Sequence, residues 1–535
     1  MAVTKFNISE LERFALQRLR RERLVELIER LGFPVEGFEE GCVLVDITPN
    51  RIDAASPEGL GRALASLTGK KTGLRRYATK PSGLSLTIHP SVLSVRPHIV
   101  AAVARLPLGE DGLRALIGLQ EKIHDTFGRR RRKASIGIHD LDRTKPPFTY
   151  RALAGDAIAF QPLDSAREMT PTQILTEHPK GREYRHIVEG KRLLPLVLDA
   201  HGPISFPPII NAERTRVTEK SKNLFIEVTG TSAEAVSQAL NIICCALAER
   251  GASIESVRCG KKLTPQLKPA ERTLSLELVN SVLGTNLTAA RAASLLARMG
   301  FGASARGASI TVLVPPYRTD ILHEIDFVED IAIALGYDSP LLTPTLPELP
   351  TIGSIIDRPP ENTARRTLIG LGFVETMGNT LTCHRTNFDL LLLPHAPACE
   401  VLNPLTEEHS LLRTHLLPSL LLVFQNAKSE KTPQRIFEIG PAFDAQGREH
   451  TRLAAAELDA AASYASARSI ADALFAELGW QVVFAPAHHP TFIPGRVAKI
   501  LLGKRELGFI GELHPQVLNN FGLEQPVAAF EIALA

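Results

Sequence analysis

The proline-rich segment LLTPTLPELPTIG, residues 341–353, limits how this chain can fold more than any other feature of its sequence. Proline lacks the N–H group that helices and central strands use, so closely spaced prolines predict an extended linker. A second polar stretch, KKTGLRRYATKPSG at residues 70–83, predicts another linker. A chain of 535 residues is also too long for one hydrophobic core. We therefore expect a multidomain α+β protein with domains at 1–78, 85–262, 268–342 and 355–535.

Within these limits, short strand-like and helix-like segments alternate. LSLTIHP, ASIGIHD and FIEVTG have the apolar character of buried strands, whereas GLRALIGLQEKIHDTFG and AEAVSQALNIICCALAERG have helical periodicity. SITVLVPP predicts a further strand. The box SPEG predicts a helix start, because Ser56 can cap, Pro57 suits the first turn and Glu58 favours the positive helix end.

Composition excludes several classes of protein. The net charge is only +3, so any contact with nucleic acid must come from local basic patches. The six cysteines form no CxxC pair, which argues against a zinc knuckle or a disulfide framework and favours a reducing cytoplasm. The N-terminus lacks the apolar core of a signal peptide, and no apolar run reaches the roughly 18 residues of a membrane span.

The segment YRTDILHEIDFVEDIAIALGYD, residues 317–338, combines an apolar helical stripe with many carboxylates. The stripe has spacings of four, three, four and three, and consists of Ile321, Ile325, Val328, Ala332 and Leu335. Asp326, Glu329 and Asp330 are expected on the opposite face, where they repel one another without a basic residue on the helix. One interpretation is a solvated acidic face with Asp320 as the helix N-cap. The other is a divalent cation held by oxygen ligands, for which Mg²⁺ is suited.

The same segment, PPYRTDILHEIDFVEDIAIALGYD, resembles the metal-binding module of phenylalanyl-tRNA synthetase beta subunits. That pattern is P-x-x-R-x-D followed by D-x-x-E-[ED], and it implies Mg²⁺ ligands at Asp320, Asp326, Glu329 and Asp330. TPNRIDAASPEGLGRAL resembles the N-terminal box of the family, and LQEKIHDTFGRRRRKASIGIHDLDRTKPPFTYRAL its archaeal and eukaryotic central domain. NPLTEEHSLLRTHLLPSLLLVFQNAK and RIFEIGPAF resemble the C-terminal domain. The chain length and the lack of added N-terminal RNA-binding domains point to the archaeal type.

The resemblance implies a fold for each domain. We expect an editing-type α+β central domain, a small winged-helix-like metal module, and a C-terminal antiparallel sheet with helices like that of class II synthetases. In RIFE, however, Arg435 lies three residues before Glu438, whereas an active second motif reads R-x-E. The last arginine is Arg505, so the third motif lacks its arginine. This domain is therefore expected to pack on a catalytic alpha subunit, in an (alpha-beta)₂ assembly, without performing the synthetic chemistry.

The resemblance also implies that the central domain hydrolyses tyrosine mischarged onto tRNA(Phe). An apolar pocket rejects an added hydroxyl only about 10²-fold, so an editing pocket must hydrogen-bond that hydroxyl. The candidate pocket residues are Leu196, Ser205 and Glu227, with Asn211 and Glu213 as alternatives. Glu227 stands where archaeal relatives tend to have aspartate.

Two further features remain open. The basic run Arg129–Lys133 follows Gly128 at a helix end, where it forms either a solvated loop or a contact for tRNA phosphates. The IHDLD stretch, with His139, lacks the further spaced histidines of a metal hydrolase and predicts a turn after a buried strand. The expected function is that of a phenylalanyl-tRNA synthetase beta subunit, which supports ATP-dependent charging of tRNA(Phe). The alternative is a free-standing aminoacyl-tRNA editing hydrolase or a tRNA-binding scaffold.

Overall fold

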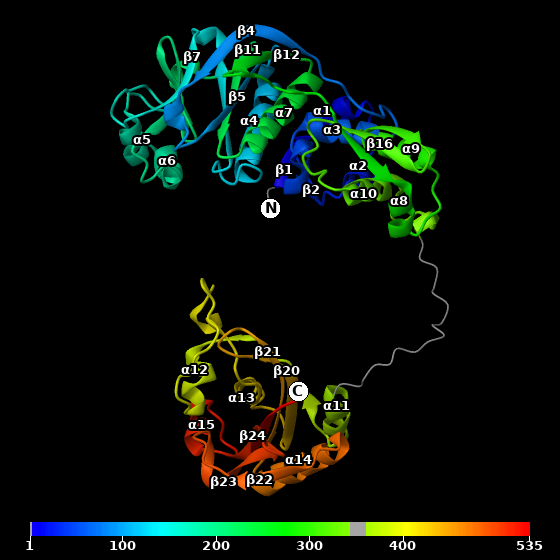
Figure 1. Ribbon diagram of the computed structural model, residues 1–535, viewed down its shortest axis with the longest axis vertical. Helices are drawn as coiled ribbons and strands as arrows, with labels where there is room; N and C mark the ends of the chain where they lie inside the picture. The colour runs from blue at the N-terminus through cyan, green and yellow to red at the C-terminus, as the bar shows by residue number, and fades with distance from the viewer. Residues whose placement is uncertain (1–2, 343–359, 535) are drawn as a thin grey trace. The chain divides into compact units, whose positions relative to one another are not determined.

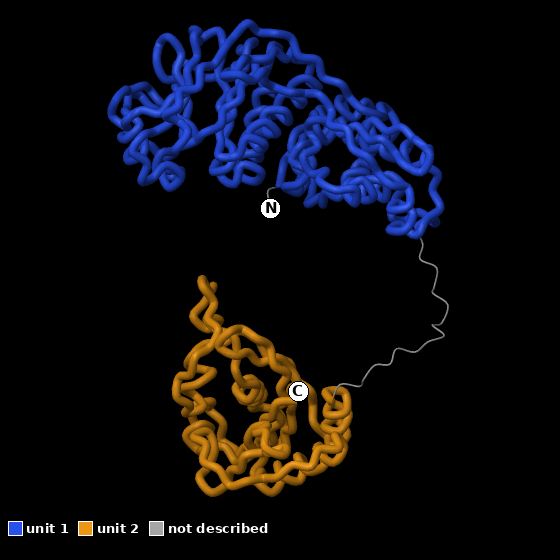
Figure 2. Tube along the Cα trace, in the orientation of Figure 1, with its two compact units in different colours: residues 1–346 blue, residues 347–535 orange. Residues whose placement is uncertain are grey.

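The computed structural model describes residues 3–342 and 360–534, which form two compact units (Figure 2). Unit 1 spans residues 1–346 and unit 2 spans residues 347–535. Most of the expected proline-rich linker lies outside the described residues. No helix of the described chain is both long and apolar enough to cross a membrane.

Unit 1 begins with a small three-stranded sheet and its helices. The strand order is β1-β3-β2, and the elements are β1 (Val3–Asn7), α1 (Ile8–Ala15), α2 (Arg21–Arg30), β2 (Val35–Glu39), β3 (Cys42–Asp46) and α3 (Pro57–Leu67). The start of α3 confirms the prediction from SPEG: the Ser56 side chain accepts a hydrogen bond from the Gly59 N–H at 3.2 Å, and Pro57 is the first helical residue. Gly61 lets α3 approach α1 closely, because a Cβ there would lie 2.4 Å from Phe14 Cβ.

A ten-stranded sheet forms the middle segment of unit 1 along the chain and fills one end of this unit (Figure 1). Its order is β10-β9-β8-β7-β4-β12-β5-β11-β6, with β13 paired to β12. The strands are β4 (Thr79–Ile88), β5 (His98–Arg105), β6 (Ala134–Asp140), β7 (Phe148–Leu153), β8 (Leu194–Asp199), β9 (Gly202–Phe206), β10 (Ile210–Asn211), β11 (Asn223–Gly230), β12 (Ser253–Cys259) and β13 (Lys262–Thr264). The Asn211 side chain on β10 donates to the Ile138 carbonyl on β6 at 3.2 Å. The first and last strands therefore meet, and the sheet is nearly closed into a barrel.

Two long helices, α4 (Gly109–Asp125) and α7 (Ala233–Glu249), lie together on the outside of this sheet (Figure 1). Two short helices, α5 (Pro171–Glu177) and α6 (Pro179–Tyr184), lie between β7 and β8 along the chain. The helices and strands expected for the central segment from periodicity are thus confirmed. The expected 70–83 linker is partly ordered by packing: the Arg75 and Tyr77 side chains each donate to Glu249 at 2.5 Å, and β4 begins at Thr79.

The last part of unit 1 is a third sheet, β14-β16-β15, with three helices. Its elements are β14 (Ala270–Ser275), α8 (Leu276–Leu283), α9 (Ala289–Arg298), β15 (Gly302–Arg306), β16 (Ser309–Val314) and α10 (Glu324–Leu335). One hydrophobic cluster, from Phe6 to Ala334, includes side chains of all three segments of unit 1. These segments therefore share a core.

Unit 2 contains a seven-stranded sheet in the order β17-β20-β21-β25-β24-β23-β22. The strands are β17 (Val374–Glu375), β20 (Gln434–Phe443), β21 (Glu449–Leu458), β22 (Val482–Pro486), β23 (Phe492–Leu502), β24 (Arg505–Leu513) and β25 (Val527–Ala533). All pairs are antiparallel except β17 with β20, so the expected antiparallel sheet is confirmed apart from that edge. Two hydrophobic clusters pack on the sheet, one with α11 (Pro360–Gly370) and α14 (Tyr464–Leu478), the other with α13 (Leu417–Asn426) and α15 (Pro515–Asn520).

Candidate functional site

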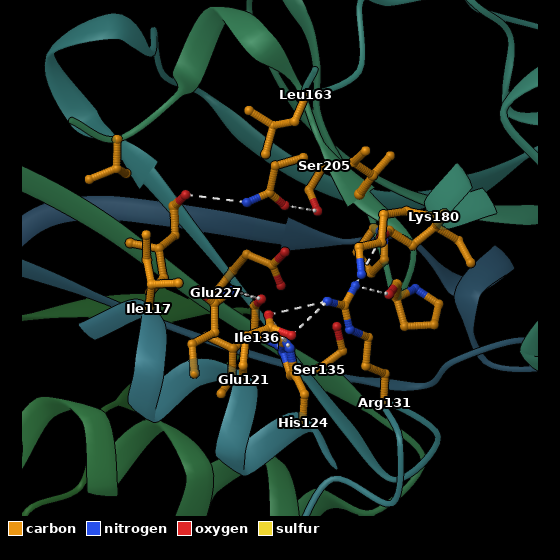
Figure 3. Close-up of a pocket in the computed structure, with 18 of the residues that line it drawn as sticks. Ile117, Glu121, His124, Arg131, Ser135, Ile136, Leu163, Lys180, Ser205 and Glu227 are labelled. Carbon is orange, nitrogen blue, oxygen red and sulfur yellow. Dashed lines mark hydrogen bonds and ion pairs between the residues drawn. The ribbon is translucent and has the colours of Figure 1, made fainter. Parts of the chain in front are cut away.

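A cavity of about 340 Å³ lies where the barrel closes, between β6, the helix α4 and the loop that joins β9 to β10. Its walls combine apolar side chains, among them Leu116, Ile117, Ile136 and Ile138, with a comparable number of polar and charged ones. Figure 3 shows the Glu227 side chain pointing into this space, with Ser205 on one side and the group of Glu121, His124 and Arg131 on the other. A concave cavity in which apolar side chains accompany convergent polar groups is a usual form of small-ligand site.

Glu227 on β11 is the most unusual polar group of the cavity. It is 1% exposed, and its Oε2 atom has no hydrogen-bond partner among the described residues. Burial raises the pKa of Glu227 to about 7, although Ser205 and the charge of Arg96 oppose the shift. A buried carboxylate oxygen without a donor is costly, so this atom is an acceptor ready for a ligand.

Gly137 on β6 makes room for that carboxylate. It is the cross-strand partner of Glu227, and a Cβ at position 137 would lie 2.3 Å from Glu227 Oε1. A side chain at position 137 would therefore displace the carboxylate. A glycine inside a strand is the sequence signal of such a close approach, and it offered a route to this site from the sequence.

His139 is fully buried beside the same space. Its Nδ1 lies 2.9 Å from Thr215 Oγ1, whereas its Nε2 has no partner among the described residues. Burial lowers the pKa of His139 to about 3, so the ring is neutral near pH 7. Asp140 then accepts a hydrogen bond from the Asp142 N–H at 3.1 Å, which confirms the expected turn after a buried strand.

The other expected pocket residues divide into two groups. Ser205 and Asn211 line the cavity, and the Ser205 hydroxyl donates to Asn211 Oδ1 at 3.1 Å. Leu196 and Glu213 are not among the lining residues. Leu196 is buried in a separate apolar cluster with Tyr184 and Phe206, and Glu213 pairs with Arg216 at 2.6 Å.

Arg131 forms hydrogen bonds to both sides of the cavity. It donates to Glu121 on α4 at 3.2 Å and to the Ile209 carbonyl in the β9–β10 loop at 3.0 Å. Burial would raise the pKa of Glu121, but His124 and Arg131 lower it to about 2. The Ile136 N–H donates to His124 Nε2 at 2.8 Å, which fixes that ring against β6. None of these residues except Arg131 was singled out from the sequence.

The acidic segment differs from its expected form. The helix α10 begins at Glu324 with His323 as its N-cap, so Asp320 is not the cap. Ile325 was expected to face inward but is 47% exposed, and Asp330 was expected to face outward but is 2% exposed. Both predictions are wrong. The buried Arg318 side chain pairs with Asp330, which explains the inward position of this carboxylate.

Arg318 neutralises two of the four expected metal ligands. Its Nη2 lies 2.7 Å from Asp320 Oδ2 and 2.6 Å from Asp330 Oδ2. Although burial disfavours its charge, Asp330 and Asp320 hold the pKa of Arg318 well above its ordinary value. Asp326 instead accepts from the Leu322 and His323 N–H groups, both at 2.7 Å.

The fourth expected ligand, Glu329, is exposed on α10. Across residues 3–342 and 360–534, no three acidic, histidine or cysteine side chains are grouped so that they could hold a metal ion. As placed, Asp320 and Asp330 bind a guanidinium and Asp326 accepts from N–H groups at the helix start, so the four carboxylates do not form a common cage for Mg²⁺.

The N-terminal box packs against this junction. Asp53 binds Arg51 at 2.9 Å and Arg62 at 3.3 Å, and the Arg62 guanidinium lies 3.5 Å from the ring centroid of Tyr317. The two motifs YRTD and TPNRIDAASPEG are therefore parts of one buried structure.

Two arginines of unit 2, the buried Arg413 and the half-buried Arg452, are paired with glutamates. Arg413 binds Glu438 at 2.6 Å, and Arg452 binds Glu531 at 2.5 Å. Arg435 lies near the start of β20 and pairs with Glu457 at 2.8 Å, as a partly exposed strand-end residue. Because these three guanidinium groups are already paired with glutamates, they are poorly placed to hold the phosphates of a nucleotide.

Comparisons with known proteins agree along the whole chain. Residues 272–337 match the family model for the tRNA synthetase B5 domain, and residues 342–534 match that for the phenylalanyl-tRNA synthetase beta chain CLM domain. The phenylalanine–tRNA ligase beta subunit of Methanospirillum hungatei is 39% identical over 96% of this chain and 94% of its own. That of Archaeoglobus fulgidus is 39% identical over 100% of this chain and 98% of its own.

A solved structure is similar to unit 1. It is an N-terminal fragment of the phenylalanyl-tRNA synthetase beta subunit from Pyrococcus horikoshii, with 38% sequence identity and a TM-score of 0.61. The similarity covers 63% of this chain and all of that fragment.

Proposed function

This chain belongs to the phenylalanine–tRNA ligase beta subunits. From that premise we propose that its central cavity is the site where the ester bond between tyrosine and a mischarged tRNA(Phe) is hydrolysed. The observation that carries this proposal is the buried Oε2 atom of Glu227, which has no partner among the described residues and lies in a cavity that also has apolar walls.

Tyrosine and phenylalanine differ by one hydroxyl group. The apolar wall accepts either ring, so discrimination has to come from the group that meets the hydroxyl. A tyrosine hydroxyl would donate to Glu227 Oε2, whereas phenylalanine would bury that oxygen without a donor. The raised pKa makes the carboxylate form, which accepts two such bonds, most available above pH 7.

The test measures deacylation of tyrosyl-tRNA(Phe) and phenylalanyl-tRNA(Phe) by the complex with its alpha subunit. The wild type is expected to favour the tyrosyl ester, and Glu227→Gln to lose about 10- to 100-fold of that preference, as for a hydrogen bond to a charged group. Glu255→Gln is the matched control, because Glu255 lies in the same sheet but pairs with Arg105 outside the cavity. Equal preference in the wild type and in Glu227→Gln would refute the assignment to Glu227.

We further propose that unit 2 docks on the alpha subunit in an (alpha-beta)₂ tetramer, and that alpha performs the synthetic chemistry. Unit 2 exposes large apolar side chains, including Met377 at 95%, Leu402 at 93% and Leu405 at 101%. Leu402 and Leu405 lie three residues apart, and exposed apolar side chains that are grouped favour a protein partner. Leu402→Asp/Leu405→Asp is expected to weaken copurification with alpha. Unchanged copurification would move the docking surface elsewhere.

The proposed compartment is the cytoplasm, where the free thiols of all six cysteines would stay reduced. Binding of tRNA(Phe) follows from the proposed hydrolysis. Magnesium binding by Asp320, Asp326, Glu329 and Asp330 stays a prediction, and it would require an ion to displace Arg318 from two of these carboxylates.

A further inference from the structure

The loop Gly128–Lys133 between α4 and β6 has an uncommon backbone. Three consecutive residues are left-handed, with φ of 50° at Arg129, 49° at Arg130 and 64° at Arg131. This region is unfavourable for residues with a Cβ and is normally visited singly. Gly128 is required by space, since a Cβ there would lie 2.5 Å from the Ala134 carbonyl oxygen.

Two buried arginines hold this loop in place. Arg96 is 2% exposed and donates to the carbonyls of Arg131 at 3.0 Å and Arg132 at 3.1 Å. Arg131 turns inward, where it binds Glu121 and Ile209 and lies 4.3 Å from the ring centroid of Tyr184. Burial lowers the pKa of Arg96 to about 10, which is a further cost of this arrangement.

The result is a set of exposed cations beside the cavity. Arg129, Arg130 and Arg132 are exposed, and none has a carboxylate partner among the described residues. Among the described residues, Arg167, Arg185 and Arg216 of the central domain have carboxylate partners, whereas the exposed Arg143, Arg151 and Arg192 have none but are far apart in the sequence. The loop therefore gathers three unpaired guanidinium groups next to Arg131, which is itself a wall of the cavity.

We propose that Arg129, Arg130 and Arg132 bind phosphodiester groups near the 3′ end of the tRNA, so that its esterified terminal nucleotide enters the cavity. This proposal builds on the proposed hydrolysis. In an aminoacyl-tRNA the nearest phosphate is on the 5′ side of the nucleoside that carries the ester, so a cavity for the ester needs cations at its rim. Guanidinium groups suit this task because they form paired hydrogen bonds to phosphate.

The first experiment uses binding and does not depend on hydrolysis. The complex with alpha is titrated with a hairpin RNA that ends in single-stranded CCA and with the same hairpin without CCA. Arg129→Gln/Arg130→Gln/Arg132→Gln is expected to bind the CCA hairpin at least about tenfold more weakly and to leave the truncated hairpin unaffected. The slope of log affinity against log salt is expected to fall by about 1.4 if two phosphates of a single strand are lost.

The matched control, Arg272→Gln/Arg291→Gln/Arg306→Gln, removes the same charge from exposed positions elsewhere in unit 1. Equal weakening by both triple variants would mean general electrostatic attraction and would overturn the proposal. The proposal would also be overturned if the loop variant, Arg129→Gln/Arg130→Gln/Arg132→Gln, bound RNA normally but no longer copurified with alpha. That result would assign the loop to a protein interface.

The second experiment separates this proposal from the editing function. Tyrosyl-tRNA(Phe) and 2′(3′)-O-tyrosyl-adenosine are compared as substrates, because the nucleoside ester has no phosphate. The loop variant is expected to raise KM for the tRNA ester at least about tenfold and to leave hydrolysis of the nucleoside ester unchanged. If the wild type hydrolyses neither ester, the editing function fails while the binding experiment still decides the role of the loop. Equal loss on both esters would refute phosphate binding.

Discussion

Replacing Glu227 by glutamine should stabilise unit 1 at high pH, because the carboxyl group is buried without enough partners to compensate its charge. In the folded chain its pKa is raised to about 7 from an ordinary value of 4.5. The folded state therefore binds more protons than the unfolded state between these values. It follows that stability falls as pH rises from about 4.5 to 7, and that the full penalty persists above pH 7.

The size of the penalty follows from the shift. A difference of about 2.5 pKa units corresponds to about 3 kcal/mol, at 1.36 kcal/mol per unit. This is an upper limit, since water that enters the cavity would solvate the carboxylate. Glu227→Gln removes the ionisation while keeping the shape, so it should raise the free energy of unfolding by up to about 3 kcal/mol at pH 8 and change it little at pH 4.5.

The sequence provides an internal control for the assay. The single tryptophan, Trp480, lies in unit 2, so its fluorescence reports unit 2 alone. Pulse proteolysis in urea, read by mass spectrometry of peptides from β6 and β11, reports unit 1. The variant should shift the unit 1 midpoint at pH 8 and leave the Trp480 transition in place. Equal unit 1 midpoints for wild type and variant at pH 8 would refute a charged, uncompensated Glu227.

Three other outcomes are expected. The beta chain alone should show no phenylalanine-dependent ATP–pyrophosphate exchange, because Arg413 and Arg452 are already paired with glutamates. Exchange should appear when alpha is added, and exchange by the pure beta chain would contradict this prediction. Arg318→Met should lower the stability of unit 1 by about 3–5 kcal/mol in urea unfolding, since it leaves a buried Asp330 charge unpaired. The double variant Arg318→Met/Asp330→Asn should recover part of this loss. Unchanged stability in Arg318→Met would show that this ion pair contributes little. EDTA tests the magnesium prediction: a fall in the unit 1 midpoint that Mg²⁺ restores would support it, and an unchanged midpoint would contradict it.

The sequence predicted best what depends on local periodicity and on the resemblance. The long helices α4 and α7, the strands β6 and β11, and the capped start of α3 follow from patterns within single segments. The cavity depends on a different kind of information, because it forms where β6 meets β10 at the closure of the barrel. Ser205 and Glu227 were found through the resemblance. Leu196, found in the same way, lies in another cluster, since neighbouring residues of a strand face opposite sides.

The acidic helix shows why charge neutralisation is hard to predict from one helix alone. Helical periodicity places Asp330 with Asp326 and Glu329, and the helix itself carries no basic residue that could neutralise them. The cation is Arg318, twelve residues before Asp330 and outside the helix, and it reaches both Asp320 and Asp330 because the segment before α10 passes beneath it. A buried ion pair can thus reverse the face that an aspartate would take by periodicity, since leaving either charge alone in the interior costs more than turning the carboxylate inward. The same reasoning applies to Arg131, which as one member of a basic run looked solvated but is buried because Glu121 and the Ile209 carbonyl meet its guanidinium.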